Sequence, residues 1–303
     1  IIDAAREAKD NAATVMAFPL PEAPESLTLL TKAGIPAFRT VESCAESVAM
    51  VLTQGHAPPE SIPSSQSNFP ENASAVLNNL ALPAGSVVNE VDAGLIFNAL
   101  DIPTPPSLTL PAEANLDEAV LKNLAFPLVA KLVSPDLAHK SDVGAVRVNI
   151  NDAGSLRESI GLMKASVARH LPNARIHSVL IQSMQSGGVE VLLGLTRDPL
   201  VGPVVTVGIG GTATEIYRDT TIRPAPIDVA QAREMIGELK GVALLHGFRG
   251  SPPADTDSLA QCIARFSCLA LETRVAEAEI NPLLVLHKGH GVVALDALLR
   301  LNH

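Results

Sequence analysis

Three oxygen-bearing side chains near the C-terminus have a spacing that suits a metal site. Glu279 and Asn281 alternate within the apolar run 275–286, so on a β-strand they share one face. A glycine-containing turn at 287–291 and a second apolar run predict a hairpin whose returning strand brings Asp296 beside Asn281. Clustered carboxylate and amide oxygens suit Mg²⁺, which combines a few protein oxygens with substrate phosphates. The spacing alone fits a polar face on an exposed hairpin equally well.

A lysine and a histidine lie close together in the middle of the chain. Lys131 falls within the apolar strand pattern 127–133, and burying an ammonium group is unfavourable unless it meets an anion such as phosphate. His139 follows in a loop, with Lys140 and Asp142 supplying a cation and a carboxylate. A histidine can attack phosphorus at neutral pH because one ring nitrogen is then unprotonated. A solvent-facing lysine and a solvated loop histidine are the alternatives.

A glycine-rich string follows the predicted strand 203–208. Gly208, Gly210 and Gly211 allow backbone N–H groups to approach phosphate oxygens. The string lacks the third glycine of the Rossmann fingerprint and the Gly-Lys-Ser/Thr of a Walker A loop, so neither motif is indicated. A glycine-rich turn without a ligand is the alternative interpretation.

Composition excludes several classes of function. Of the 303 residues, 47% are hydrophobic, enough for a sizeable core in about two domains. The net charge of −10, the 3% aromatic content and the lack of tryptophan argue against nucleic-acid binding. No run of about 18 apolar residues occurs, so no membrane span is expected. Three sparse cysteines without metal-ligand spacing fit a reducing cytoplasm.

The patterning predicts two structured regions. Residues 1–54 read as β-α-β-α, the end of a doubly wound α/β domain. Because the chain opens with Ile1 inside a helical pattern, we expect it to be part of a longer polypeptide. Residues 55–85 begin rich in proline and serine and are predicted to be a linker. Residues 86–303 mix short antiparallel strands with helices, which predicts an α+β domain. Its helices are expected at 89–99, 116–124, 156–171, 230–239 and 259–271.

The ordered motifs together resemble the ATP-grasp domain of the NDP-forming acyl-CoA synthetases, the ADP-forming acetate–CoA ligases. These enzymes are relatives of the succinyl-CoA synthetase β subunit. The match covers roughly residues 86–300. Its motifs lie at 131–144, 187–194, 197–205, 208–212, 247–250 and 279–282. Residues 1–53 are similar to the tail of the succinyl-CoA-ligase-like flavodoxin domain that precedes the grasp domain in fused chains. The implied fold is a two-lobed α+β ATP-grasp domain preceded by that tail.

The resemblance implies roles for the matching positions. Those implied to bind the nucleotide are Lys131 at the phosphates, Gln182, Ser183 and Met184 at adenine, Glu190 near the ribose, and the glycine pair Gly210 and Gly211.

The remaining implied roles concern metal and catalysis. Asn281 and Asp296, with Glu279 beside them, match the Mg²⁺ ligands, and His139 matches the second phosphohistidine position. One departure is Gly144-Ala145, where the family usually has two glycines. Alanine carries a Cβ and adopts fewer backbone conformations than glycine, so a phosphate is expected to approach this turn less closely.

The implied reaction joins an acid to coenzyme A with ATP, giving acyl-CoA, ADP and phosphate through a phosphohistidine. ATP or ADP and Mg²⁺ are the implied cofactors. Coenzyme A and the carboxylic acid would bind through domains outside this chain. A cytoplasmic homo-oligomer of the full-length chain is expected, with no nucleic-acid or membrane partner. The alternative is a nucleotide- or acyl-CoA-sensing regulatory module of a protein lysine acetyltransferase. A carboxylate–amine ligase is disfavoured by His139 and the flavodoxin-like tail.

Overall fold

The computed structural model falls into two compact units, Ile1–Ser61 and Ile62–His303. The residues that it describes are 2, 15–19, 23–54, 68–114, 116, 118–137, 140, 142–211 and 219–302. Within these ranges, no helix has both the length and the apolar character needed to cross a membrane.

The first unit contains two helices and one short parallel pairing of extended segments. Helix α2 (Pro24–Lys32) carries proline in its first turn, where the missing N–H is not needed. A parallel bridge joins Ala17 to Ala37, and helix α3 (Val41–Gln54) follows. This order matches the predicted β-α-β-α pattern. Its assignment to a flavodoxin-like domain remains a prediction.

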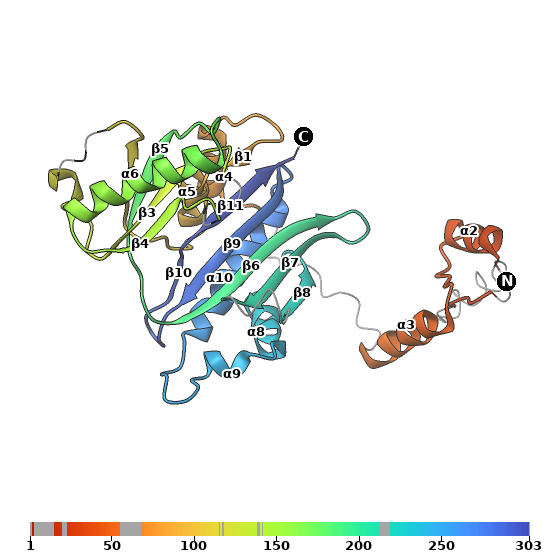
Figure 1. Cartoon of the computed structure of the whole chain (residues 1–303). Coiled ribbons are helices and arrows are strands. Elements are labelled where there is room, and N and C mark those ends of the chain that lie inside the picture. The colour runs from red at the N-terminus through yellow and green to blue at the C-terminus, as the bar shows by residue number, and fades with distance from the viewer. Residues whose placement is uncertain are drawn as a thin grey trace. The chain divides into compact units, whose positions relative to one another are not determined.

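A large antiparallel sheet organises the second unit (Figure 1). In the described part of the chain its path is β1-β11-β9-β6-β7-β8, with β10 paired to β9. The strands are β1 (Val87–Val88), β6 (Val189–Asp198), β7 (Gly202–Ile209), β8 (Thr220–Pro224), β9 (Val275–Val285), β10 (Val292–Ala294) and β11 (Ala297–Leu301). We call this sheet and its helices the large lobe.

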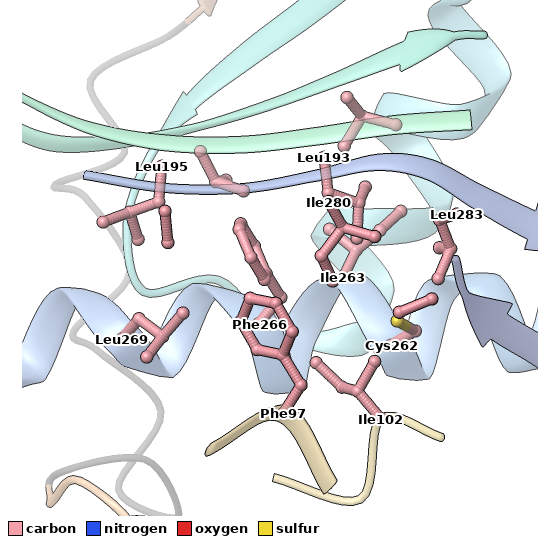
Figure 2. Packing of buried hydrophobic residues seen from close by; sticks show 14 of the residues in the cluster. Phe97, Ile102, Leu193, Leu195, Cys262, Ile263, Phe266, Leu269, Ile280 and Leu283 are labelled. Atoms are coloured by element: carbon pink, nitrogen blue, oxygen red, sulfur yellow. The ribbon is translucent and has the colours of Figure 1, made fainter. Parts of the chain in front are cut away.

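Helices pack under one face of the large sheet. They are α4 (Glu71–Asn79), α5 (Glu90–Ala99), α8 (Val229–Glu238), α9 (Val242–Leu245), α10 (Thr256–Ser267) and the 3₁₀ turn η3 (Cys268–Leu271). Alternate residues of β6, Leu193 and Leu195, point into this core, where Phe97 and Phe266 have ring centroids 5.9 Å apart (Figure 2). Strand alternation therefore leaves the opposite face of the sheet to polar residues such as Glu279 and Asn281.

A second antiparallel sheet forms the small lobe. Among the described residues its order is β2-β5-β3-β4, and α6 covers one face (Figure 1). The elements are β2 (Ser107–Pro111), η2 (Glu118–Leu121), β3 (Leu128–Val133), β4 (Val146–Ile150), α6 (Ala153–His170) and β5 (Ser178–Ser183). Leu128, Ala130 and Leu132 of β3 pack in one core with α6. Lys131 alternates with them and therefore faces away from α6.

Two antiparallel sheets with helices confirm the predicted α+β two-lobed fold. Three local features differ from the sequence expectation. Helix α4 lies inside the segment predicted as a linker; it buries Ala73 and Leu77 and packs Val76 against the core, while most of its other positions are polar. The helix expected at 116–124 is a short 3₁₀ turn, η2. The returning strand of the C-terminal hairpin is split, with Leu295 and Asp296 between β10 and β11.

Candidate functional site

Lys131 is buried at the junction of the two lobes. Only 6% of the residue is exposed. Its Nζ lies 2.5 Å from Oε1 of Glu90 and donates a hydrogen bond of 2.7 Å to the Leu295 carbonyl oxygen. Strand β3 of the small lobe thus presents a cation to α5 and the β10–β11 connection of the large lobe. The buried ammonium group meets an anion, as its desolvation cost requires.

Glu90 receives a second lysine on its other oxygen. It is the first residue of α5, and the side chain of Asn89 caps that helix by accepting from the N–H groups of Val91 and Asp92. Lys140, in the loop after β3, places Nζ 2.5 Å from Glu90 Oε2 and 3.4 Å from Asp296 Oδ1. We call these four residues, Lys131, Lys140, Glu90 and Asp296, the clasp, because its lysines belong to the small lobe and its carboxylates to the large lobe.

The clasp shifts the ionisation of its members. Burial raises the pKa of Glu90 despite the opposing charge of Lys131, and the charge of Asp296 adds to the rise. Burial acts in the same direction on Asp296, but the charges of Lys131 and Lys140, together with hydrogen bonds from Glu90 and the Ala297 N–H, lower the pKa of that carboxyl. For Lys140, burial opposes the charged form, yet Glu90 and Asp296 raise its pKa. The two lysines and two carboxylates sum to zero formal charge.

Of the three residues expected to hold a metal, Asp296 belongs to the clasp, and Glu279 and Asn281 lie on the neighbouring strand β9. The Asn281 side-chain amide donates to Glu279 Oε1 at 3.1 Å, and the Asn281 N–H donates to the Asp296 carbonyl at 3.2 Å. Within the described ranges, no group of three or more His, Cys, Asp or Glu side chains could hold a metal by itself. Two carboxylates and an amide oxygen still fit Mg²⁺, which completes its shell with water and phosphate oxygens.

We call residues 182–184, at the end of β5, the hinge between the lobes. The resemblance implies that its backbone meets adenine, but two of its N–H groups are already hydrogen-bonded. The N–H of Ser183 donates to the Pro106 carbonyl and that of Met184 to the Pro127 carbonyl, each at 2.9 Å. These two N–H groups are therefore engaged within the chain. Gln182 is only 7% exposed and lines a pocket with Glu90 and Asp296. No residue in the described part of the chain hydrogen-bonds to its amide, and a buried amide in this condition points to solvent or a ligand.

Glu190, Gly210 and Gly211 form a second group at the end of β7. The Gly210 N–H donates to the Glu190 carbonyl at 2.6 Å. A Cβ on Gly210 would lie 2.8 Å from the Glu190 carbonyl carbon, so the close approach requires glycine. Gly211 has φ +95°, and a Cβ there would lie 3.7 Å from Glu190 Oε2. The two glycines thus allow the backbone at 210–211 to lie close to the exposed side chain of Glu190.

His139 was predicted from the sequence, whereas Glu90 and Lys140 were not assigned to the site before the structure was known. His139 lies outside the described residues. Glu90 carries no local sequence signal, since an acid in the first turn of a helix is ordinary. Lys140 stands within the 131–144 motif, but its partners are separated from it by many positions in the sequence. Only the packing of α5 against the small lobe shows that both belong to the site.

Comparison with known proteins identifies the family. Residues 81–301 match the profile of the ATP-grasp domain. The chain belongs to the ATP-grasp family.

Within the ATP-grasp proteins, the chain groups with ADP-forming acyl-CoA synthetases. It is 34% identical over 212 residues to the acetate–CoA ligase [ADP-forming] II subunit beta of Pyrococcus furiosus, covering 69% of this chain and 89% of that subunit. It is 40% identical over 182 residues to acetate–CoA ligase [ADP-forming] I of Archaeoglobus fulgidus. That match covers 59% of this chain and 26% of the longer relative. The chain thus spans about a quarter of one relative and most of the other.

A solved structure supports the same assignment. The match is the dinucleotide-forming acetyl-coenzyme A synthetase 1 of Ca. Korarchaeum cryptofilum, in complex with coenzyme A, Ca-AMPCP and HgCl+. The TM-score is 0.69 at 32% identity, covering 76% of this chain and 99% of that chain. These relatives are ligases and synthetases, so the alternative of an acetyltransferase regulatory module is not supported.

Proposed function

We propose that this chain is the nucleotide-binding, phosphoryl-transferring part of an ADP-forming acyl-CoA synthetase. The whole reaction would convert an acid, coenzyme A and ATP to acyl-CoA, ADP and phosphate. The observation that carries the proposal is the clasp, in which buried lysines and carboxylates from both lobes meet beside the acid–amide group of β9. Its support is the family membership and the solved relative that holds Ca-AMPCP and coenzyme A.

In this proposal, the residues bind and position the polyphosphate. Lys131 would neutralise phosphate charge, and Gln182 would face the nucleotide from the small lobe. Glu190, beside Gly210 and Gly211, would contact the ribose. Glu279, Asn281 and Asp296 would hold Mg²⁺, which would neutralise charge that develops on the phosphate oxygens. Catalysis of this kind consists mainly of positioning and charge stabilisation.

The backbone observations refine the proposed adenine contact. Because the Ser183 and Met184 N–H groups are already hydrogen-bonded, adenine would meet their carbonyl groups or the next part of the hinge. We retain His139 as the proposed phosphoryl acceptor on the strength of the family resemblance. In that step a ring nitrogen would form a bond to the γ-phosphorus as the bond to ADP breaks.

Several wider features remain part of the proposal. Coenzyme A and the carboxylic acid would bind to other parts of the enzyme, as the chain spans 26% of its longer relative. The proposed domain division is a flavodoxin-like tail at 1–54, a linker within 55–85 and the ATP-grasp domain at 86–303. A cytoplasmic location is supported by the three free cysteines. Assembly as a homo-oligomer is proposed for the full-length enzyme.

Calorimetric titration of the chain with Mg·ADP and Mg·ATP tests the proposal. Saturable binding is expected. No binding up to millimolar nucleotide in a folded sample would contradict it. Because coenzyme A and the acid are proposed to bind to other parts of the enzyme, this chain alone should not form acyl-CoA from acid, coenzyme A and ATP.

A further inference from the structure

A bidentate ion pair holds the start of the loop that follows β3. The Arg175 side chain donates from Nη2 to Oδ1 of Asp136 and from Nε to Oδ2, each at 3.1 Å. The Arg175 N–H donates to the same Oδ2 at 2.9 Å. Strands β3 and β5 pair as far as Val133 and Ser178, so the two residues meet just beyond the end of the sheet. Three hydrogen bonds therefore fix one carboxylate against the segment before β5.

The Arg175–Asp136 pair supplies geometry more than stability. The Arg175 side chain is 72% exposed and that of Asp136 is 32% exposed, and exposed ion pairs contribute little to the free energy of unfolding. Hydrogen bonds from Arg175 lower the pKa of Asp136 to about 2, so the carboxylate stays charged near neutral pH. A bidentate arginine–carboxylate pair also fixes the direction of both planar groups. The start of the loop is therefore held in one position.

The end of the same loop is fixed independently. Ser166 of α6 donates from Oγ to the Val143 carbonyl oxygen at 3.0 Å. Gly144 has φ +67°, and a Cβ there would lie 2.8 Å from Ser166 Oγ, so this contact requires glycine. The Ala145 N–H donates to the Lys140 carbonyl oxygen at 2.8 Å. Lys140 thus lies between two anchored points of the loop.

We propose that Arg175 is a positioning residue of the nucleotide site, acting through Asp136 on the loop that carries Lys140. The inference rests on the proposed function. Lys140 reaches the large lobe, with Nζ 2.5 Å from Glu90 Oε2 and 3.4 Å from Asp296 Oδ1. A lysine side chain has many rotamers, so these contacts depend on a fixed backbone beneath it. Loosening the start of the loop would separate Lys140 from Asp296, a proposed Mg²⁺ ligand.

Lysine footprinting of the ligand-free chain tests the link between Arg175 and Lys140. The Lys140 side chain is 17% exposed, so an amine-reactive acetylating reagent should label it about threefold or more faster in Arg175→Gln, where the loop opens more often. Peptide mass spectrometry reads the labelling. Lys122, exposed on the small lobe, should be labelled equally in both proteins. Arg233→Gln breaks an exposed pair with Asp257 in the large lobe and should leave Lys140 labelling unchanged.

Calorimetry with Mg·ADP tests whether this positioning affects the nucleotide site. Arg175→Gln and Asp136→Asn should each weaken binding by about three- to tenfold, because displacement of supporting groups is costly in a preorganised site. The double variant should be no weaker than either single variant, since Arg175 acts through Asp136. Arg233→Gln should change affinity by less than about twofold. Unfolding in urea should change little for all of these variants.

The outcomes separate a positioning role from an ordinary surface ion pair. Equal labelling of Lys140 in wild type and Arg175→Gln, or wild-type affinity in Arg175→Gln, would overturn the inference. Additive losses in the double variant, or a large loss of stability in urea, would also overturn it. Failure of the wild-type chain to bind Mg·ADP would overturn the proposed function, and the labelling comparison would then decide whether Arg175 positions Lys140.

Discussion

Two buried regions of the second unit are held together by different forces. The core under the large sheet is apolar, with Leu193, Ile280 and Phe266 interleaved between β6, β9 and α10 (Figure 2). The clasp is equally shielded at Lys131 and Glu90 but consists of charges. Apolar burial stabilises in proportion to area and without direction, whereas buried charges stabilise only when each has its partner. The core therefore stabilises the large lobe, and the ion pairs of the clasp join the two lobes.

The difference has a functional consequence. Replacing one apolar core residue leaves a cavity and lowers stability without changing charge. Replacing one member of the clasp leaves another charge without its partner and would at the same time alter the proposed phosphate site. A substitution in the clasp is therefore expected to change both stability and nucleotide affinity, whereas a substitution in the core is expected to change stability alone.

The largest effect is expected in the apolar core. Leu193→Ala should lower the free energy of unfolding by about 3–5 kcal/mol, because Leu193 is fully buried and its removal creates a cavity. Leu200→Ala at the β6–β7 turn makes the same chemical change at a side chain that is 92% exposed, and should cost less than about 0.5 kcal/mol. Urea unfolding measures both. Similar losses for the two variants would remove the distinction between core and surface.

A slightly smaller loss is expected in the clasp. Glu90→Gln should lower the free energy of unfolding by about 3 kcal/mol, since it leaves two lysines without their shared carboxylate. Glu113→Gln is the control, because Glu113 pairs with Lys164 while its side chain is 93% exposed. That change should be nearly neutral. A Glu90→Gln protein as stable as wild type would show that the ion pairs of the clasp contribute nothing to the free energy of unfolding.

Two glycines give a third comparison, Gly188 in the connection between β5 and β6 and Gly289 in the turn between β9 and β10. Gly188 has φ +94°, and a Cβ there would lie 2.4 Å from the Val285 carbonyl oxygen. Gly289 has φ +85° with no atom within 4 Å of such a Cβ. Both alanine variants are strained by about 1–2 kcal/mol, and Gly188→Ala should lose about 1–2 kcal/mol more from the clash. Chemical denaturation should show that Gly188→Ala loses more stability than Gly289→Ala. Equal losses would mean that the backbone around Gly188 can shift to remove the clash.

The smallest effect is a difference in acid sensitivity. Burial raises the pKa of Asp296, but the charges of Lys131 and Lys140 and two hydrogen bonds lower it below its ordinary value. A lowered pKa gives stability that is present above the ordinary value of 3.8 and is lost as pH falls through the folded-state value. The stability advantage of wild type over Asp296→Asn should therefore shrink as pH falls from about 5 to about 3. Thermal melts across this range check it, and a constant gap would contradict the assigned lysine contacts.

Sequence patterns predicted the core better than the clasp. Alternation in 275–286 correctly placed Glu279 and Asn281 on the face opposite the core, because strand periodicity is local. For Lys131 the sequence left two alternatives, a buried cation in need of an anion and a solvent-facing lysine, and the structure shows it buried. Its actual partner, Glu90, is 41 residues away, and Lys140 contacts Asp296 across 156 residues. No local rule specifies such pairs, which depend on how two lobes pack.

The spacing of Glu279, Asn281 and Asp296 does not show how the charge of the two carboxylates is balanced. In the structure, Lys140 lies beside Asp296, and two charges of each sign balance. The ligand-free site is thus neutralised from within. Asp296→Asn should then lower the stability of the ligand-free protein rather than raise it.

The magnesium dependence of nucleotide affinity tests most directly whether the clasp and its neighbours form the phosphate and metal end of the site. Calorimetry would compare ADP binding with and without Mg²⁺ in wild type, Asp296→Asn and the exposed control Asp257→Asn. Wild type and control should gain about tenfold or more in affinity from Mg²⁺, and Asp296→Asn should lose most of that gain, about 1.4 kcal/mol. An undiminished gain in folded Asp296→Asn, or no gain in wild type, would contradict the account.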